Sequence, residues 1–319
     1  SDENFKHFGK PGGRNGAGDA GYPQLRVVAL MNLSNRLLAG AEASPWAESE
    51  HALAKKLWAL IPDNSLTIVD RGFMNYLSFL ELVADGENRH FMIRAKSNTA
   101  FDVVEELSDG SALALLHPNT FLLHYQPDVP GPIEVRVIEY QYEGGEPGRL
   151  IVSLTDAEKY PAAELIELYH DRWELEIGFD ELKTHMLERN ESLRSRKVEG
   201  VYQELWGQLL VYNLVRREML LVAKQKELPP KRISFRSSLL WIRNFWLTAS
   251  RTAPGTIPKK LAEFESTLDV LVIPERRSER RYPRHVKIKM SNYARNRGTR
   301  GVKKRVSAKD AKKTAANSP

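Results

Sequence analysis

The sequence predicts a mixed α/β fold in which helices cover a largely buried sheet. Three observations lead to this fold class. Short apolar runs alternate with helical patterns in the first third, a stretch with strand character follows, and helical patterns then dominate. Strands and helices in this order usually build a sheet flanked by helices. The chain has 319 residues, 42% of them hydrophobic, which is enough to bury a sizeable core.

The first predicted elements are two paired strands, QLRVVALMN (24–32) and NRLLAGAEAS (35–44), separated by two residues. A helix is expected over 46–61, opened by Ser44-Pro45, because its leucines have helical spacing. LTIVD (66–70) indicates a short buried strand that ends in an aspartate.

A helix near 74–84 and a strand over 90–95 complete this first part. Residues 97–160 differ in character. VRVIEYQY (135–142) and RLIVSL (149–154) have strand composition and are separated by the turn-forming EGGEPG. The sequence therefore predicts a β-rich insertion at this point.

Helical patterns dominate the remainder. They lie at 161–186, 199–226, 235–249 and 257–272. We expect five parts: a first core part (1–96), the insertion (97–160), a second core part with the long helices (161–226), C-terminal helices (227–273) and a basic tail (274–319). The tail is expected to be disordered from about residue 298.

Composition excludes several classes of protein. No apolar run is long enough for a transmembrane helix, and the first residues lack the apolar core of a signal peptide. The absence of cysteine excludes disulfides and thiolate metal sites and fits a reducing interior. The histidines show no zinc spacing. We expect no membrane partner.

Charge is segregated along the chain. Residues 274–319 contain 16 Lys and Arg against 3 Asp and Glu, whereas the preceding residues contain 31 against 38. A basic end on a mildly acidic body indicates a polyanion partner, with nucleic acid first and a membrane surface second. A solubilising tail is the equally weighted alternative.

The most informative segment is the predicted helix over 161–186. At about 100° per residue, a narrow stripe lies between two apolar flanks on its wheel. The stripe contains Tyr169, Arg172, Glu176 and Lys183. A carboxylate between apolar surfaces is costly unless it is paired or binds a metal. Cations beside it suit phosphate oxygens. The plainer alternative is an ordinary i,i+4 ion pair between Arg172 and Glu176.

A second arc of the same helix is acidic, and we expect it to face solvent. It contains Glu167, Asp171, Glu174 and Glu181.

Asp70 is a second candidate carboxylate. It ends the predicted strand 66–70, and functional side chains in α/β folds often lie at such strand ends. Arg71 and Gly72 follow and suit a turn close to a phosphate. The alternative is a plain helix N-cap or turn aspartate.

Together these residues resemble a known family. Tyr169, Arg172, Glu176 and Lys183 have the Y-(2)-R-(3)-E-(6)-K spacing typical of insertion-sequence 4 family transposases, and Asp70 in VDRGF is similar to that family's second catalytic aspartate. The segments LRSRKVEGVYQELWGQLLVYNLVRRE (193–218) and RRYPRHVKIKMSNY (280–293) resemble its following helix and its basic C-terminal segment.

The resemblance implies a ribonuclease-H-like mixed sheet, flanked by helices, with a β-rich insertion before the helix of the catalytic Glu. It implies metal-dependent cleavage and strand transfer at the ends of a mobile element, with Mg²⁺ as cofactor and Mn²⁺ able to substitute. Asp70 and Glu176 would be catalytic and bind the metal. DNA contacts are expected from Tyr169, Arg172, Lys183, Arg71, Arg194, Arg196, Lys197, Arg280, Arg281, Arg284 and Lys287. We expect a homodimer on DNA, in the cytoplasm and associated with the nucleoid.

The sequence departs from the family's pattern at its start. The family's first catalytic aspartate should lie on a strand shortly before ENFKHFG, where only Ser1 and Asp2 precede that segment. We therefore expect this chain, as given, to be unable to cleave DNA. Two alternatives stay open: a non-catalytic DNA-binding transposase remnant, and a structure-specific nuclease with the same fold.

Overall fold

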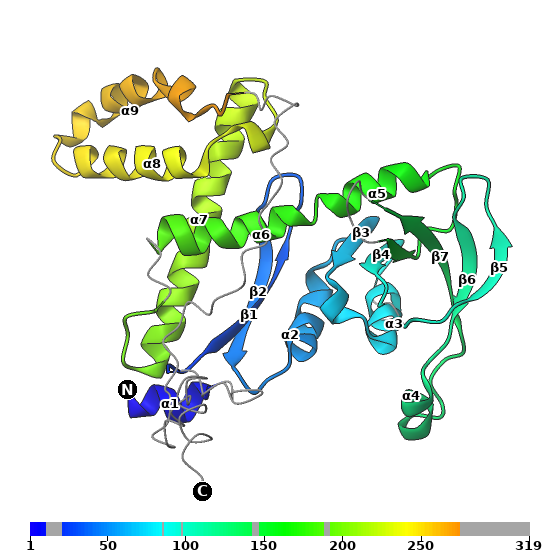
Figure 1. Ribbon diagram of the computed structural model, residues 1–319. Coiled ribbons are helices and arrows are strands. Elements are labelled where there is room, and N and C mark those ends of the chain that lie inside the picture. Colours follow the sequence, from blue (N-terminus) through cyan, green and yellow to red (C-terminus); the bar gives the residue numbers. More distant parts are fainter. Residues whose placement is uncertain (11–20, 85, 97, 142–146, 188–191, 275–319) are drawn as a thin grey trace, which may run out of the picture.

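A computed structural model gives the arrangement of the chain, and Figure 1 shows it. The structure describes residues 1–10, 21–84, 86–96, 98–141, 147–187 and 192–274. The predicted mixed α/β class is confirmed, because the described residues form a six-stranded mixed sheet with helices on both of its faces.

The large sheet has the strand order β3-β4-β8-β7-β6-β5. Only β3 and β4 are parallel, and every other pair is antiparallel. The bounds are Ser65–Val69 for β3, Arg89–Arg94 for β4, Asp102–Glu106 for β5, Ala112–Leu116 for β6, Ile133–Tyr140 for β7 and Gly148–Val152 for β8. The predicted β-rich region thus continues the sheet begun by β3 and β4.

A separate two-stranded ribbon precedes this sheet. Strands β1 (Leu25–Met31) and β2 (Leu38–Pro45) pair antiparallel, so the predicted strand pair is confirmed. The ribbon packs against α2 (Glu50–Leu57) and against the long helix α7 (Val198–Gln225). Helix α2 begins later than the sequence predicted because β2 continues to Pro45 and Ser49 is the N-cap.

The large sheet is packed on both faces, as the two-residue period of its strands requires. Phe91 and Ile93 of β4 point into a core with Trp58 and with Phe79 of α3 (Tyr76–Ala84). The intervening Met92 points to the other face, where it packs with α5 (Ala162–His170). The start of α5 is therefore fixed to the sheet.

The predicted helix over 161–186 is divided into three consecutive segments. These are α5, α6 (Trp173–Asp180) and a π-helical segment, Glu181–Met186. Figure 1 shows α5 and α6 running nearly in line from the large sheet towards α7. The π-helical segment contacts α7. Leu209, Tyr212 and Met219 of α7 belong to a further hydrophobic core, to which Leu182 of the π-helical segment also contributes.

The remaining helices are short or lie at the ends of the described chain. They are α1 (Asp2–Phe8), α4 (Thr120–Tyr125), α8 (Phe235–Ala249) and α9 (Ile257–Glu265). Helices α8 and α9 pack side by side, and α8 also packs against α7 near its C-terminal end (Figure 1). Over the residues that the structure describes, no helix has the length and apolar character needed to cross a membrane.

Candidate active site

Asp70 directly follows β3 and caps a short 3₁₀ turn, Arg71–Phe73. Its Oδ1 accepts a hydrogen bond of 2.8 Å from the backbone N–H of Arg71. The plain capping role considered from the sequence is therefore present. The side chain is nevertheless 59% exposed, so the cap leaves the carboxylate open to further ligands.

Arg172 brings the two candidate carboxylates together. One terminal nitrogen lies 3.7 Å from Oδ1 of Asp70, and the other lies 3.4 Å from Oε1 of Glu176. The second contact is the i,i+4 pair that the sequence left as an alternative. Asp70 and Glu176, far apart in the sequence, thus meet at one guanidinium, while their catalytic role stays a prediction.

The contacts of Arg172 are loose. Charge-assisted hydrogen bonds between a guanidinium and a carboxylate are usually about 2.7–2.9 Å, and both distances here are longer. The Nε atom of Arg172 is buried and has no hydrogen-bond partner within the described part of the chain. Arg172 therefore retains hydrogen-bonding capacity beyond these two carboxylates.

The ring of Tyr169 packs against the Arg172 guanidinium. The side chain is 7% exposed, and the Arg172 guanidinium carbon lies 5.8 Å from the ring centroid. Burial raises the pKa of the Tyr169 phenol, and the Asp70 carboxylate adds to this, whereas the Arg172 and Arg94 cations oppose it. The phenol of Tyr169 is thus neutral and buried, and it supports the Arg172 guanidinium rather than being exposed to contact DNA.

Arg94 is a cation near the site that the sequence analysis missed. It ends β4, and the parallel register pairs Val69 with Ile93, so Arg94 and Asp70 follow at the same edge of the sheet. Its guanidinium lies 6.0 Å from the ring centroid of Tyr140. The rule that parallel strands end at one edge could have identified it, because Asp70 was already recognised as a strand end.

The other predicted contacts lie on the surface or outside the described residues. Lys183 is exposed on the π-helical segment, and Arg71 is exposed beside Asp70. Arg194, Arg196 and Lys197 are exposed just before α7. The basic tail from residue 275, including its predicted disorder, lies outside the described residues, as do Arg280, Arg281, Arg284 and Lys287.

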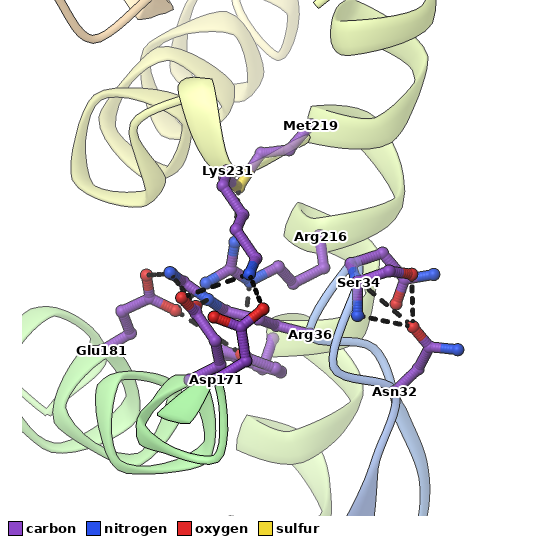
Figure 2. A network of polar contacts seen from close by, with 11 residues as sticks. Asn32, Ser34, Arg36, Asp171, Glu181, Arg216, Met219 and Lys231 are labelled. Carbon is purple, nitrogen blue, oxygen red and sulfur yellow. Dashed lines mark hydrogen bonds and ion pairs between the residues drawn. The ribbon is translucent and has the colours of Figure 1, made fainter. Parts of the chain in front are cut away.

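One expectation for this helix was wrong for two of its four residues. In the arc predicted to face solvent, Glu167 is exposed and Asp171 is half exposed, but the side chains of Glu174 and Glu181 are only 13% and 9% exposed. Arg36, from the turn between β1 and β2, pairs with both glutamates, and Arg216 of α7 pairs with Glu181 (Figure 2). A helical wheel shows which residues share a face, but it cannot show that neighbouring elements will bring cations to cover it.

The two carboxylates at Arg172 suit a hard divalent cation. Mg²⁺ in phosphoryl-transfer sites is usually held by one or two carboxylates together with waters and phosphate oxygens. Asp70 and Glu176 provide such oxygens at one exposed place. Within the described ranges, no group of three or more His, Asp and Glu side chains is arranged to hold a metal.

Comparison with known proteins identifies the family. Residues 3–214 match the family model described as "Transposase DDE domain". The chain belongs to the DDE transposase family. The matched range contains Asp70 and the whole Tyr169–Lys183 stripe, whereas α8, α9 and the basic tail lie beyond it.

This transposase chain is 34% identical over 267 residues to "Transposase InsG for insertion sequence element IS4" of Escherichia coli (strain K12). That similarity covers 83% of this chain and 60% of InsG, so the chain spans about 60% of that relative. The predicted resemblance to insertion-sequence 4 transposases is confirmed.

A solved structure, "Cryo-EM structure of piggyBac transposase synaptic complex with hairpin DNA (SNHP)", is similar with a TM-score of 0.45 and 12% identity. The match covers 80% of this chain and 52% of that one.

Proposed function

We propose that this transposase chain contributes the active-site region for metal-dependent cleavage and strand transfer at the ends of a mobile element. The observation that carries the proposal is the meeting of Asp70 and Glu176 at Arg172. We further propose that the first core strands and helices correspond to a ribonuclease-H-like fold, to which strands β5–β8 add the inserted part.

Each residue of the site has a proposed role. Asp70 and Glu176 hold Mg²⁺, for which Mn²⁺ can substitute. When bound, the metal supplies charge stabilisation to the attacking and leaving oxygens of the phosphodiester. Arg172 exchanges its loose carboxylate contacts for a phosphate oxygen, with Tyr169 beneath it as a fixed support.

The surrounding cations orient the nucleic acid. Arg71 directly follows Asp70, Arg94 ends the neighbouring strand and Lys183 is exposed seven residues after Glu176. These three cations would contact phosphates, which fix the position of DNA without reading its sequence. Three exposed cations before α7 would contact phosphates further along the DNA. They are Arg194, Arg196 and Lys197. The segment with Arg280, Arg281, Arg284 and Lys287 would bind DNA without sequence preference and with strong salt dependence.

The expected setting is the bacterial cytoplasm, on the nucleoid, with two copies acting on one pair of element ends. DNA is the proposed partner because the predicted site combines carboxylates with several cations, the pattern needed for a phosphodiester backbone.

A second candidate is DNA binding without catalysis. It is favoured by the ligand count, because the described residues offer two converging carboxylates and no third His, Asp or Glu beside them. Two-metal phosphoryl transfer generally needs more ligands than that. The two candidates therefore differ in chemistry but share a DNA-binding surface.

A nicking and binding assay separates them. The probe is DNA that carries the sequences flanking the gene, with Mg²⁺ or Mn²⁺, and the proteins, each produced with the coding sequence upstream of residue 1, are the wild type, Glu176→Gln and the control Glu167→Gln. Glu167 is exposed on α5, outside the candidate site. Nicking that is lost only in Glu176→Gln supports catalysis. Binding without nicking by the wild type supports the second candidate, and absence of both binding and nicking overturns both.

A further inference from the structure

A largely covered network of ion pairs joins the acidic face of α6 to neighbouring elements (Figure 2). Arg36 donates to Glu174, and its Nη1 donates to Oε1 of Glu181 at 3.0 Å. Arg216 of α7 pairs with the other oxygen of Glu181 and also donates to the Tyr212 hydroxyl at 3.2 Å. The network therefore ties the β1–β2 turn and α7 to the segment that carries Glu176.

Lys231 closes the network from the C-terminal side. Its Nζ lies 3.0 Å from Oδ2 of Asp171 and 3.5 Å from Oε1 of Glu174. Three carboxylates thus meet three cations, so no net charge is buried. Arg216 and Glu181 are 3% and 7% exposed. At such burial, each charge depends on its partner, and the relative positions of the elements become fixed.

The backbone at Arg36 is held in an unusual conformation. Its φ is 60°, in the left-handed region that favours glycine. The turn is closed by hydrogen bonds from the Arg36 N–H to the Asn32 carbonyl, at 2.8 Å, and from Ser34 N–H to Asn32 Oδ1, at 3.0 Å. A residue with a side chain has a conformational cost in this region. The ion pairs of the Arg36 guanidinium with Glu174 and Glu181 offset that cost.

The geometry of α6 couples the network to the site. Glu174 and Glu176 are two residues apart, so they point about 200° apart around the helix. Fixing the rotation of α6 at Glu174 therefore fixes the direction in which Glu176 projects. Glu181 provides a second fixed point at the start of the π-helical segment, whose wider turns change the direction of the residues that follow.

We propose that Arg36 is a positioning residue for Glu176. It acts through Glu174 and Glu181, sets the rotation of α6 about its axis, and so keeps the Glu176 carboxylate beside Asp70. Arg36 itself touches no reacting group. The importance of this alignment for catalysis rests on the proposed function, whereas the alignment itself does not.

The test measures the alignment directly in the full chain. The protein has no cysteine, so Asp70→Cys with Glu176→Cys creates a single thiol pair for a short thiol-reactive crosslinker. Arg36→Gly is added to this pair, because glycine suits the left-handed backbone at this position while the whole arginine side chain, with its guanidinium, is removed. Arg36→Lys keeps the charge but cannot reach both glutamates as a fork does.

The matched control is Arg89→Met. The side chain of Arg89 is 10% exposed, close to the 12% of Arg36, and it pairs with Asp63 at 3.0 Å. Arg89 begins β4, so it lies at the end of this strand away from the candidate site. We expect Arg36→Gly to slow crosslinking markedly, Arg36→Lys to slow it less, and Arg89→Met to leave it unchanged. All rates are compared where circular dichroism shows folded protein. An unchanged rate in Arg36→Gly, or an equal loss in Arg89→Met, overturns the proposal.

A second readout uses Mn²⁺ binding, measured by electron paramagnetic resonance on chains that keep Asp70 and Glu176. Arg36→Gly should weaken Mn²⁺ affinity by about tenfold, the usual size for losing a residue that orients a ligand. If crosslinking responds but the wild type binds no Mn²⁺, the positioning role stands and the proposed metal site fails. If Mn²⁺ binds and crosslinking does not respond, the positioning role fails alone.

Discussion

The two faces of α6 use the same residue types in opposite ways. On one face, Arg172 contacts Glu176 and Asp70 at 3.4 and 3.7 Å, and these carboxylates are 49% and 59% exposed. On the other face, Glu174 and Glu181 are 13% and 9% exposed and pair closely with buried arginines. The loose, open face is suited to exchanging partners with a ligand, and the closed face is suited to holding the frame.

The difference has an energetic basis. Exposed ion pairs contribute about 0–1 kcal/mol because water and salt screen them. Removing one partner of a buried pair costs about 3–5 kcal/mol, since the remaining charge has no water to solvate it. Stability measurements on variants of the two faces should therefore separate them clearly.

The largest effect is expected for Glu181→Ala. This change leaves Arg216, which is 3% exposed, without its carboxylate. The free energy of unfolding, measured by urea denaturation, should fall by about 3–5 kcal/mol. A loss below about 1 kcal/mol would mean that water reaches Arg216 and that the two faces are not distinct.

A second ion pair, between the buried Arg136 of the large sheet and the partly exposed Asp109, extends the comparison to acid. Arg136 is fully buried on β7 and pairs with Asp109, which also accepts a 2.8 Å hydrogen bond from the Ala162 N–H at the start of α5. Burial alone would raise the pKa of the Asp109 carboxyl. Hydrogen bonds from Ser111 and Ala162 and the Arg136 cation outweigh this and hold the pKa below its ordinary value.

Asp109→Asn should lower the free energy of unfolding by about 1–3 kcal/mol at neutral pH. A carboxyl with a lowered pKa in the folded state stabilises the protein above its unfolded pKa of about 3.9, and this stability is lost as pH falls through the folded pKa. The difference between wild type and variant should therefore shrink below about pH 4. Urea denaturation from pH 3 to 7 measures it, and a difference independent of pH would exclude the charged form of Asp109 as the cause.

The smallest effect is expected for Glu176→Ala. Its pair with Arg172 is exposed, so the free energy of unfolding should change by less than about 1 kcal/mol. Thermal and urea denaturation beside Glu181→Ala provide the direct comparison. A loss as large as that of Glu181→Ala would show that Glu176 is a structural residue, and it would weaken its assignment to the site.

Regular, locally encoded elements were predictable from the sequence. The strand pair β1 and β2 followed from two apolar runs, the first rich in β-branched residues, on either side of a short turn. Helix α8 was predicted with its observed bounds, 235–249. The spacing of Tyr169, Arg172 and Glu176 placed them on one stripe, because a helix fixes the relative directions of its side chains whatever surrounds it.

Features that depend on distant segments were not predictable. Strand β6 (ALALL) has no alternating pattern and becomes a strand because β5 and β7 pair with it. Arg36 gave no signal, since an arginine in the left-handed region is rare. Arg216 did carry one: it lies on the apolar face of α7 with Tyr212 and Met219, and a cation there requires a buried partner.

Strand β8 has a consequence for how the protein folds as it is made. It lies between β4 and β7, and its residues Leu150, Ile151 and Val152 are fully buried. The far edge of β4, at residues 92–94, can therefore pair only after the chain through residue 152 has left the ribosome. Non-local pairing of this kind is slow and leaves an apolar strand edge open meanwhile. The nascent chain should consequently depend on chaperones until β8 closes the sheet.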